Sequence, residues 1–212
     1  MNSQSFISLL QLVLPAYLLG SIPFGLLIGR VGGIDIREHG SGNIGATNVF
    51  RIVGKKYGIA CLLLDALKGF IPVVIALNLV RITGRDPQFH LVFLDSMHLQ
   101  LAAMEQLKGQ FVHVLTAIAA VLGHNYSPWL GFKGGKGIAT SAGVLIALMP
   151  AAVVILLLVF IITLTATRYV SVASMVSAAS LPLLTLWGSW HHGRLQDGTW
   201  NKPLLAFTIV IA

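Results

Sequence analysis

Residues 40–51 read GSGNIGATNVFR and lie between two long apolar runs. The glycines allow positive φ angles and the close approach of a ligand, and consecutive free N–H groups in such a turn form a concave anion site. If a helix starts near Asn43, Thr47 and Arg51 fall four residues apart on one face, and the planar Arg51 guanidinium suits a phosphate. The stretch therefore predicts a phosphate-binding loop at a membrane surface. A helix-entry turn with a stray basic residue is the alternative.

The composition around this loop indicates an integral membrane protein. Of 212 residues, 56% are hydrophobic and 10% are charged, against about 25% charged in a soluble domain. The net charge of +7 indicates basic cytoplasmic loops and affinity for anionic lipid or phosphate. Because the basic residues are scattered, we expect no nucleic-acid partner. A single cysteine, Cys61, excludes a disulfide framework.

The apolar pattern predicts an all-α fold with seven transmembrane helices. The first basic residues, Arg30 and Arg37, follow the first span, so the positive-inside rule places the N-terminus outside and the C-terminus in the cytoplasm. Residues 1–5 carry no positive charge, so we expect no cleaved signal peptide. The expected spans are 6–29, 57–80, 111–122, two short spans within 138–166 joined near Pro150, 169–187, and a last helix from 204. One long kinked helix over 138–166 is the alternative, and the nine residues 204–212 are too short to span, so we expect the chain to be cut off inside this helix.

Two charged residues, Asp65 and Lys68, fall inside the second span. Charges at this depth are costly and suggest function, and their i, i+3 spacing allows a pair. Lys68 either lines a polar cavity open to the cytoplasm or completes a structural ion pair in the bundle.

A second glycine-rich stretch, residues 131–140, reads GFKGGKGIAT. It is not a P-loop, because no Ser or Thr follows the lysine. It still combines a flexible backbone, two lysines and a helix start, which attract anions. Just before it, His124 is either an acid–base group or a structural histidine. The predicted topology places both glycine loops on the cytoplasmic side. Two anion-binding loops on one side are harder to explain as helix-packing features than either loop alone.

Two other patterns carry no chemistry. Residues 40–45 fit G-x-G-x-x-G, but a dinucleotide fingerprint requires a hydrophobic strand before the glycines, and the preceding residues 35–39 read DIREH. Residues 81–110 show apolar side chains at spacings of three and four. That segment predicts an external amphipathic helix lying on the membrane.

Residues 40–51, 123–124 and 132–140 together resemble the bacterial acyl-phosphate:glycerol-3-phosphate acyltransferases. The GSIP element at 20–23 and the charged pair of span two fit the same pattern, and the match covers nearly the whole chain. The resemblance implies a single seven-helix acyltransferase domain over residues 1–212. It also implies a multi-pass location in the bacterial inner membrane, a cytoplasmic active site, a monomer, and no cofactor or metal.

The implied reaction moves an acyl chain from acyl phosphate to the 1-hydroxyl of sn-glycerol 3-phosphate, releasing 1-acyl-sn-glycerol 3-phosphate and phosphate. This is the first acylation of bacterial phospholipid synthesis. The catalytic residues implied are Ser41, Arg51, Lys136 and His124. The substrate-binding residues implied are Gly40, Gly42, Asn43, Gly45, Thr47, Asn48, Lys68, Lys133, Gly134, Gly135, Gly137, Thr140, Ser171 and Ser174. The chain departs from the family in its longer segment 81–110 and in lacking the family's basic C-terminal tail.

Acyl phosphate has a good leaving group, so positioning and charge stabilisation can carry the reaction. We therefore expect direct transfer without an acyl-enzyme, with His124 or a substrate phosphate oxygen as the base. Two other functions remain open. An exporter of a phosphorylated small molecule would use the intramembrane charges and broken helices, although no inverted repeat is evident. A non-catalytic lipid-binding scaffold would leave the small polar residues unexplained.

Overall fold

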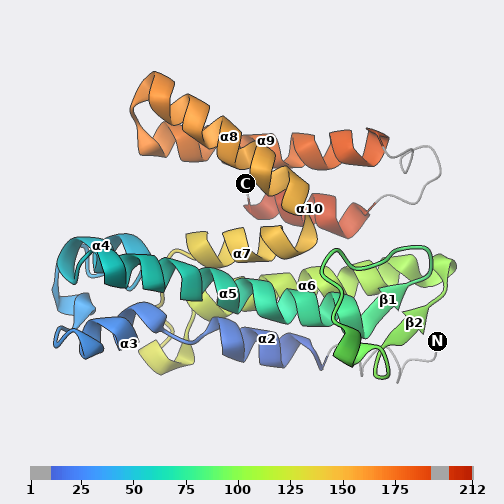
Figure 1. The fold of residues 1–212 in the computed structure, drawn as a ribbon, viewed down its shortest axis with the longest axis horizontal. Coiled ribbons are helices and arrows are strands. Elements are labelled where there is room, and N and C mark those ends of the chain that lie inside the picture. Colours follow the sequence, from blue (N-terminus) through green and yellow to red (C-terminus); the bar gives the residue numbers. More distant parts are fainter. Residues whose placement is uncertain (1–10, 192–200, 212) are drawn as a thin grey trace.

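A computed structural model describes residues 11–191 and 201–211, without the side chains of residues 170, 171 and 211. Most of this chain is helical. In Figure 1 the helices α2, α5, α6 and α7 form one layer, the α8–α9 hairpin lies above it, and α10 lies between them. The expected start of the first span at residue 6 lies outside the described residues.

The first span is broken into α2 (Val13–Gly20) and α3 (Phe24–Val31). Pro23 precedes α3 and has no N–H to continue the helix, so the backbone between the two helices needs other partners. Ser127 Oγ donates to the Ser21 carbonyl at 2.7 Å. Trp129 Nε1 donates to Ser21 Oγ at 2.8 Å. The break is therefore held by the segment that follows α6.

A turn η1 (Ile36–Glu38) and a short helix α4 (Ala46–Ile52) lead into α5 (Lys55–Leu79). Gly54 adopts φ +126° at the corner between α4 and α5, a conformation that side-chain-bearing residues rarely take. With 25 residues, α5 is about 37 Å long and crosses the whole lower layer (Figure 1).

The predicted amphipathic helix over residues 81–110 is wrong. The chain instead forms β1 (Val80–Ile82), η2 (Val92–Leu94), β2 (Leu99–Leu101) and η3 (Ala103–Glu105). The two strands are parallel, with Val80 opposite Leu99, so the described fold is not purely helical.

The apolar spacing of this segment reflects separate contacts rather than one helix face. Leu94 and Leu101 are buried, whereas Met97 and Met104 are 69% and 91% exposed. The Asn78 amide at the end of α5 fixes the path, because it donates to Phe89 O and accepts from the amide N–H of Leu91, both at 2.8 Å. Long-range side-chain contacts thus override the local periodicity.

After β2 the chain runs through α6 (Gln106–Asn125), a turn η4 (Pro128–Leu130), α7 (Ile138–Leu148) and α8 (Pro150–Thr167). The expected division of residues 138–166 into two helices near Pro150 is confirmed, with Pro150 starting α8. Of the two, α8 is long and apolar enough to cross a membrane, whereas α7 is a shorter apolar helix. The helix at the expected third span begins five residues before Phe111, at Gln106, and it is not among the segments of the described chain that are long and apolar enough to cross a membrane.

The chain ends in α9 (Val170–His191) and α10 (Lys202–Ile211). Four segments of the described chain are long and apolar enough to cross a membrane: Val13–Val31, Lys55–Leu79, Pro150–Thr167 and Val172–His191. No residue of α8 is buried, which fits a lipid-facing helix. The count of seven spans and the orientation of the termini stay predictions.

Small residues bring the start of α7 against the middle of α5. A Cβ added at Gly69 would overlap the backbone oxygen of Thr140, and one added at Gly143 would overlap that of Ala66. Such close approach between helices needs glycine or other small residues at the crossing. The crossing places the second glycine loop beside Asp65.

Candidate active site

The first glycine loop is held in shape by the buried Asn48. Its amide nitrogen donates to the carbonyls of Ile36, His39 and Asn43 at 2.9–3.2 Å, and its Oδ1 accepts from the Ser41 amide at 3.1 Å. Because backbone groups inside a turn need such partners, these hydrogen bonds of Asn48 stabilise the conformation of the loop. Its polar atoms are thereby occupied.

Two further features shape this loop. Asn43 Oδ1 accepts from the Gly45 amide at 2.7 Å, an Asx turn that leads into α4. Gly40 adopts φ +61° with no room for a Cβ beside Asn48 Oδ1. The helix begins at Ala46 rather than near Asn43.

The second glycine loop folds back onto the end of α6. The amides of Gly134 and Gly135 donate to the carbonyls of Asn125 and His124 at 3.0 and 3.2 Å. A Cβ at Gly135 would overlap the His124 ring. Glycine is therefore required for the backbone to pass over the imidazole, and the loop and His124 form one unit.

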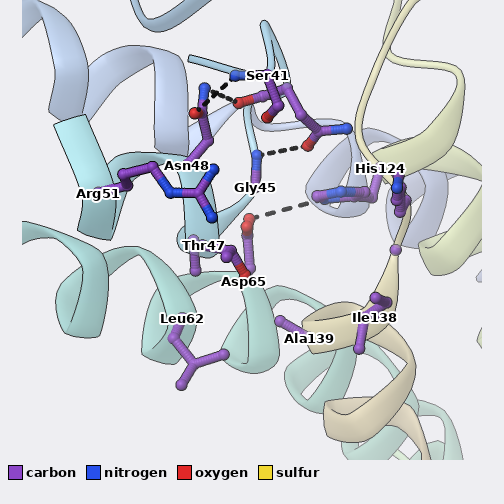
Figure 2. A pocket seen from close by; sticks show the side chains of 14 residues that line it. Ser41, Gly45, Thr47, Asn48, Arg51, Leu62, Asp65, His124, Ile138 and Ala139 are labelled. Carbon is purple, nitrogen blue, oxygen red and sulfur yellow. Dashed lines mark hydrogen bonds and ion pairs between the residues drawn. The ribbon is translucent and has the colours of Figure 1, made fainter. Parts of the chain in front are cut away.

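The two loops meet at a cavity of about 440 Å³ (Figure 2). Many of the predicted site residues line it, contributed by the first loop, α4, α6 and the second loop. These are Ser41, Asn43, Gly45, Thr47, Asn48, Arg51, His124, Lys136 and Gly137, joined by Ala46, Leu62, Asp65, Ile138 and Ala139. The expectation that Thr47 and Arg51 share a helix face is confirmed, since both lie on α4 and line the cavity.

The cavity carries two cations that are not neutralised. Within residues 11–191 and 201–211, Arg51 and Lys136 make no hydrogen bond or ion pair with another side chain, and both are exposed. Unpaired cations converging on one concave site attract anions from solution. Arg51 presents a planar fork for two phosphate oxygens, whereas Lys136 acts as a point charge.

The charged pair of α5 is split between the cavity and the core. Lys68 Nζ lies 2.8 Å from Asp65 Oδ1, and both side chains are 2% exposed. Nζ also donates to the Ile22 carbonyl at 2.7 Å, in the break between α2 and α3. Asp65 lines the cavity and Lys68 does not. Our site prediction missed Asp65, although an acidic residue inside a span was the available signal.

Several predicted substrate-binding residues do not line the cavity. Lys68 stabilises the helix break, and Ser174 is exposed on α9, which packs against α8 and α10. The side chain of Ser171 lies outside the described residues. Lys133 is exposed on the second loop. The remaining residues of this group shape the loops or the α5–α7 crossing: Gly40, Gly42, Gly134, Gly135 and Thr140.

The entrance to the first loop is held by an exposed ion pair. Arg37 donates to both Asp35 carboxylate oxygens at 2.9 and 2.6 Å. These hydrogen bonds lower the pKa of Asp35 to about 2. Among the described residues, no group of three His, Cys, Asp or Glu side chains is placed to hold a metal ion.

Comparison with known proteins identifies the family. A family model described as glycerol-3-phosphate acyltransferase matches residues 10–212. The glycerol-3-phosphate acyltransferase of Geotalea daltonii is 46% identical over 173 residues, covering 82% of this chain and 75% of the relative. That of an Anaeromyxobacter species (strain Fw109-5) is 41% identical over 203 residues, covering 95% and 87%.

Solved structures show the same fold. The crystal structure of PlsY (YgiH), an integral membrane glycerol 3-phosphate acyltransferase, in its glycerol 3-phosphate form matches with a TM-score of 0.72 and 38% identity, covering 96% of this chain and 84% of that chain. Its lysophosphatidic acid form matches with a TM-score of 0.71. The two glycine loops, their shared cavity and these similarities agree: the chain belongs to the glycerol-3-phosphate acyltransferase family of integral membrane proteins.

Proposed function

We propose that this protein transfers an acyl chain from acyl phosphate to the 1-hydroxyl of sn-glycerol 3-phosphate. The products are 1-acyl-sn-glycerol 3-phosphate and phosphate, in the first acylation step of bacterial phospholipid synthesis. The observation that carries the proposal is the cavity at which both glycine loops meet, with the unpaired Arg51 and Lys136 on its wall. The relatives' names and the ligands of the PlsY crystal forms support glycerol 3-phosphate as the acceptor.

The composition of the cavity wall suits these two substrates. Both carry a phosphate, and the wall offers two cations. The apolar side chains of Leu62 and Ile138 line the same cavity and are 49% and 75% exposed, so an acyl chain can lie against them while it enters from the bilayer. Acyl phosphate already carries a good leaving group, so charge stabilisation and orientation supply the main catalytic effect.

In this proposal Ser41, Arg51, Lys136 and His124 act on the reacting groups, and transfer is direct. Asn48 and the glycines position these side chains through the loop backbone. Residues 1–212 form one seven-span domain of the bacterial inner membrane, with the cavity facing the cytoplasm. The protein acts as a monomer in the bilayer.

The deciding experiment incubates the purified protein in detergent with acyl phosphate and sn-glycerol 3-phosphate. We expect phosphate and lysophosphatidic acid to appear in equal amounts, and incubation with the donor alone to leave the protein mass unchanged. Phosphate without the lipid would mean hydrolysis instead of transfer. An acylated Ser41 or Cys61 would contradict direct transfer, and the absence of both products from folded protein would favour the exporter.

A further inference from the structure

The segment that follows α6 is attached to the break between α2 and α3 by side chains of both segments. Ser127 Oγ donates to the Ser21 carbonyl at 2.7 Å, and Trp129 Nε1 donates to Ser21 Oγ at 2.8 Å. One turn earlier on α2, the Tyr17 hydroxyl donates to the Tyr126 carbonyl. Figure 1 shows this segment, drawn in yellow, beside the break. These hydrogen bonds join parts of the chain that are more than 100 residues apart.

The attachment is buried and closely packed. The hydrogen-bonded serines, Ser21 and Ser127, are 0% and 1% exposed. A Cβ added at Gly20 would overlap the backbone of Ala120, and one added at Gly123 would overlap the backbone of α2. Because α2 and α6 touch backbone to backbone here, the break offers the following segment a fixed point of attachment.

The backbone of Ser127 carries this attachment into the second glycine loop. Its carbonyl accepts hydrogen bonds from the amides of Leu130 and Phe132 at 3.1 and 2.9 Å. Phe132 adopts φ +63°, and a side-chain-bearing residue keeps such a conformation only when its surroundings hold it there. Four residues further on, Lys136 lines the cavity.

The chain around Lys136 cannot fix the lysine by itself. Its neighbours in the loop include Gly134, Gly135 and Gly137, and glycine leaves the backbone free to take many conformations. A charge that stabilises a reacting phosphate is effective only when it is held in place before the reaction. The order of this loop must therefore come from the residues at its base, of which Ser127 is the one tied to another helix.

We propose that Ser127 and Trp129 are positioning residues for acyl transfer and that they act on the reaction through Lys136. Neither residue lines the cavity, so neither touches substrate. This role rests on the proposed function and goes beyond it, because it gives the break between α2 and α3 a part in the reaction. The break fixes where the second glycine loop starts, and thereby where the lysine charge stands.

The test is a double-mutant cycle on the purified protein in detergent. Ser127→Ala removes the donor to the Ser21 carbonyl and should lower kcat/KM for acyl transfer about 10-fold, as for a displacement of the lysine by less than about 1 Å. In the Lys136→Ala background the same change should lower kcat/KM less than about 2-fold, because the group that Ser127 positions is gone. The affinity for inorganic phosphate, measured by calorimetry, should show the same pattern.

The matched control is Thr116→Val, which removes another buried hydroxyl of α6. Thr116 Oγ1 donates to the Val112 carbonyl at 2.8 Å, so this hydrogen bond stays inside the helix. We expect kcat/KM within about 2-fold of the parent in both backgrounds.

The same fold-loss from Ser127→Ala in both backgrounds would overturn the proposal, because a general loss of folded protein acts on both alike. Unchanged kcat/KM in Ser127→Ala would overturn it too. If Ser127→Ala is not folded by size-exclusion chromatography, Trp129→Phe takes its place in the cycle. It removes the Nε1 donor from a side chain that is 65% exposed, and its loss of about 3-fold should likewise vanish in Lys136→Ala.

The two proposals fail separately. Acyl transfer by the wild type together with equal losses in both backgrounds would refute only the positioning role. Loss of phosphate affinity in Ser127→Ala but not in the Lys136→Ala background, without acyl transfer by the wild type, would refute only the proposed reaction.

Discussion

A buried asparagine amide holds a loop at each end of the α5–α6 pair. The two ends differ in whether the basic residues compared below have acidic partners. At one end the buried amide of Asn48 holds the first glycine loop. At the other end the buried amide of Asn78 holds the segment between β1 and β2. Figure 1 shows these ends at opposite sides of the molecule, beside α4 and beside the two strands.

The cations distinguish the ends. Near the strands Arg81 pairs with Asp95 at 2.6 Å, His90 also contacts Asp95, and Lys108 lies 3.2 Å from Glu105. Beside the cavity Arg51 and Lys136 have no such partner within the described chain. A basic residue paired within the protein supports the fold, whereas one left unpaired on a concave wall is available to a ligand. The presence or absence of an acidic partner therefore distinguishes the structural end of the pair from the end that carries the candidate site.

The strongest challenge to this comparison is Arg51→Ala. We expect kcat/KM for acyl transfer to fall about 1,000-fold, the upper end for losing one pre-organised charge contact. The melting temperature should stay unchanged, since the side chain is exposed. Arg81→Ala is the matched control at the other end, where we expect turnover within about 2-fold and a slightly lower melting temperature. Normal turnover in Arg51→Ala would remove this residue from the site.

The second glycine loop carries two lysines, of which Lys136 lines the cavity and Lys133 does not. Comparing their alanine variants tests whether position at the cavity matters within one loop. Lys136→Ala should lower kcat/KM about 100-fold, the lower end for losing one pre-organised charge contact. Lys133→Ala should lower it less than about 10-fold, because Lys133 does not line the cavity and can act only through long-range attraction. Raising the salt concentration should diminish the Lys133 effect and not the Lys136 effect. Equal losses in both variants would mean that the loop acts as a diffuse basic patch.

Replacing the buried amides of Asn48 and Asn78 tests whether two similar structural contacts affect stability alike but turnover differently. Asn48→Ala and Asn78→Ala each leave buried backbone groups unpaired, at about 1–3 kcal/mol per group, so both should lower the melting temperature in detergent. Only Asn48→Ala should reduce kcat of the remaining folded protein, because the loop it staples carries Ser41. A comparable fall in kcat for Asn78→Ala would show that the two ends are coupled.

The smallest expected effect is the pH dependence of the Asp35–Arg37 pair. The Asp35 pKa of about 2 lies below the value of about 3.9 for an aspartate in the unfolded chain, so folding favours the ionised carboxylate. The stabilisation is fully present above about pH 4 and disappears as the pH falls through 2. Melting temperatures of wild type and Asp35→Asn should therefore differ slightly at pH 6 and converge toward pH 2. A constant difference over this range would assign the effect to packing.

Sequence reasoning succeeded where local pattern carries the information. Apolar runs located α5, α8 and α9 because a span must satisfy its backbone internally and bury its side chains in lipid. The two glycine loops were recognised from residue types alone. The same reasoning failed between β1 and β2, where spacings of three and four suggested a helix but the contacts of Asn78 decide the path.

By itself the sequence determined that this is a helical membrane protein with two basic glycine-rich loops, because hydrophobicity and glycine content act locally. Only the tertiary structure decided that Asp65 lines the cavity while Lys68, three residues later, turns to the helix break at Ile22. The i, i+3 spacing puts both on one side of α5, and it cannot say which of them meets the cavity. That choice depends on α7 crossing α5 at Gly69 and on α2 breaking beside Lys68, and both are contacts between segments far apart in the chain.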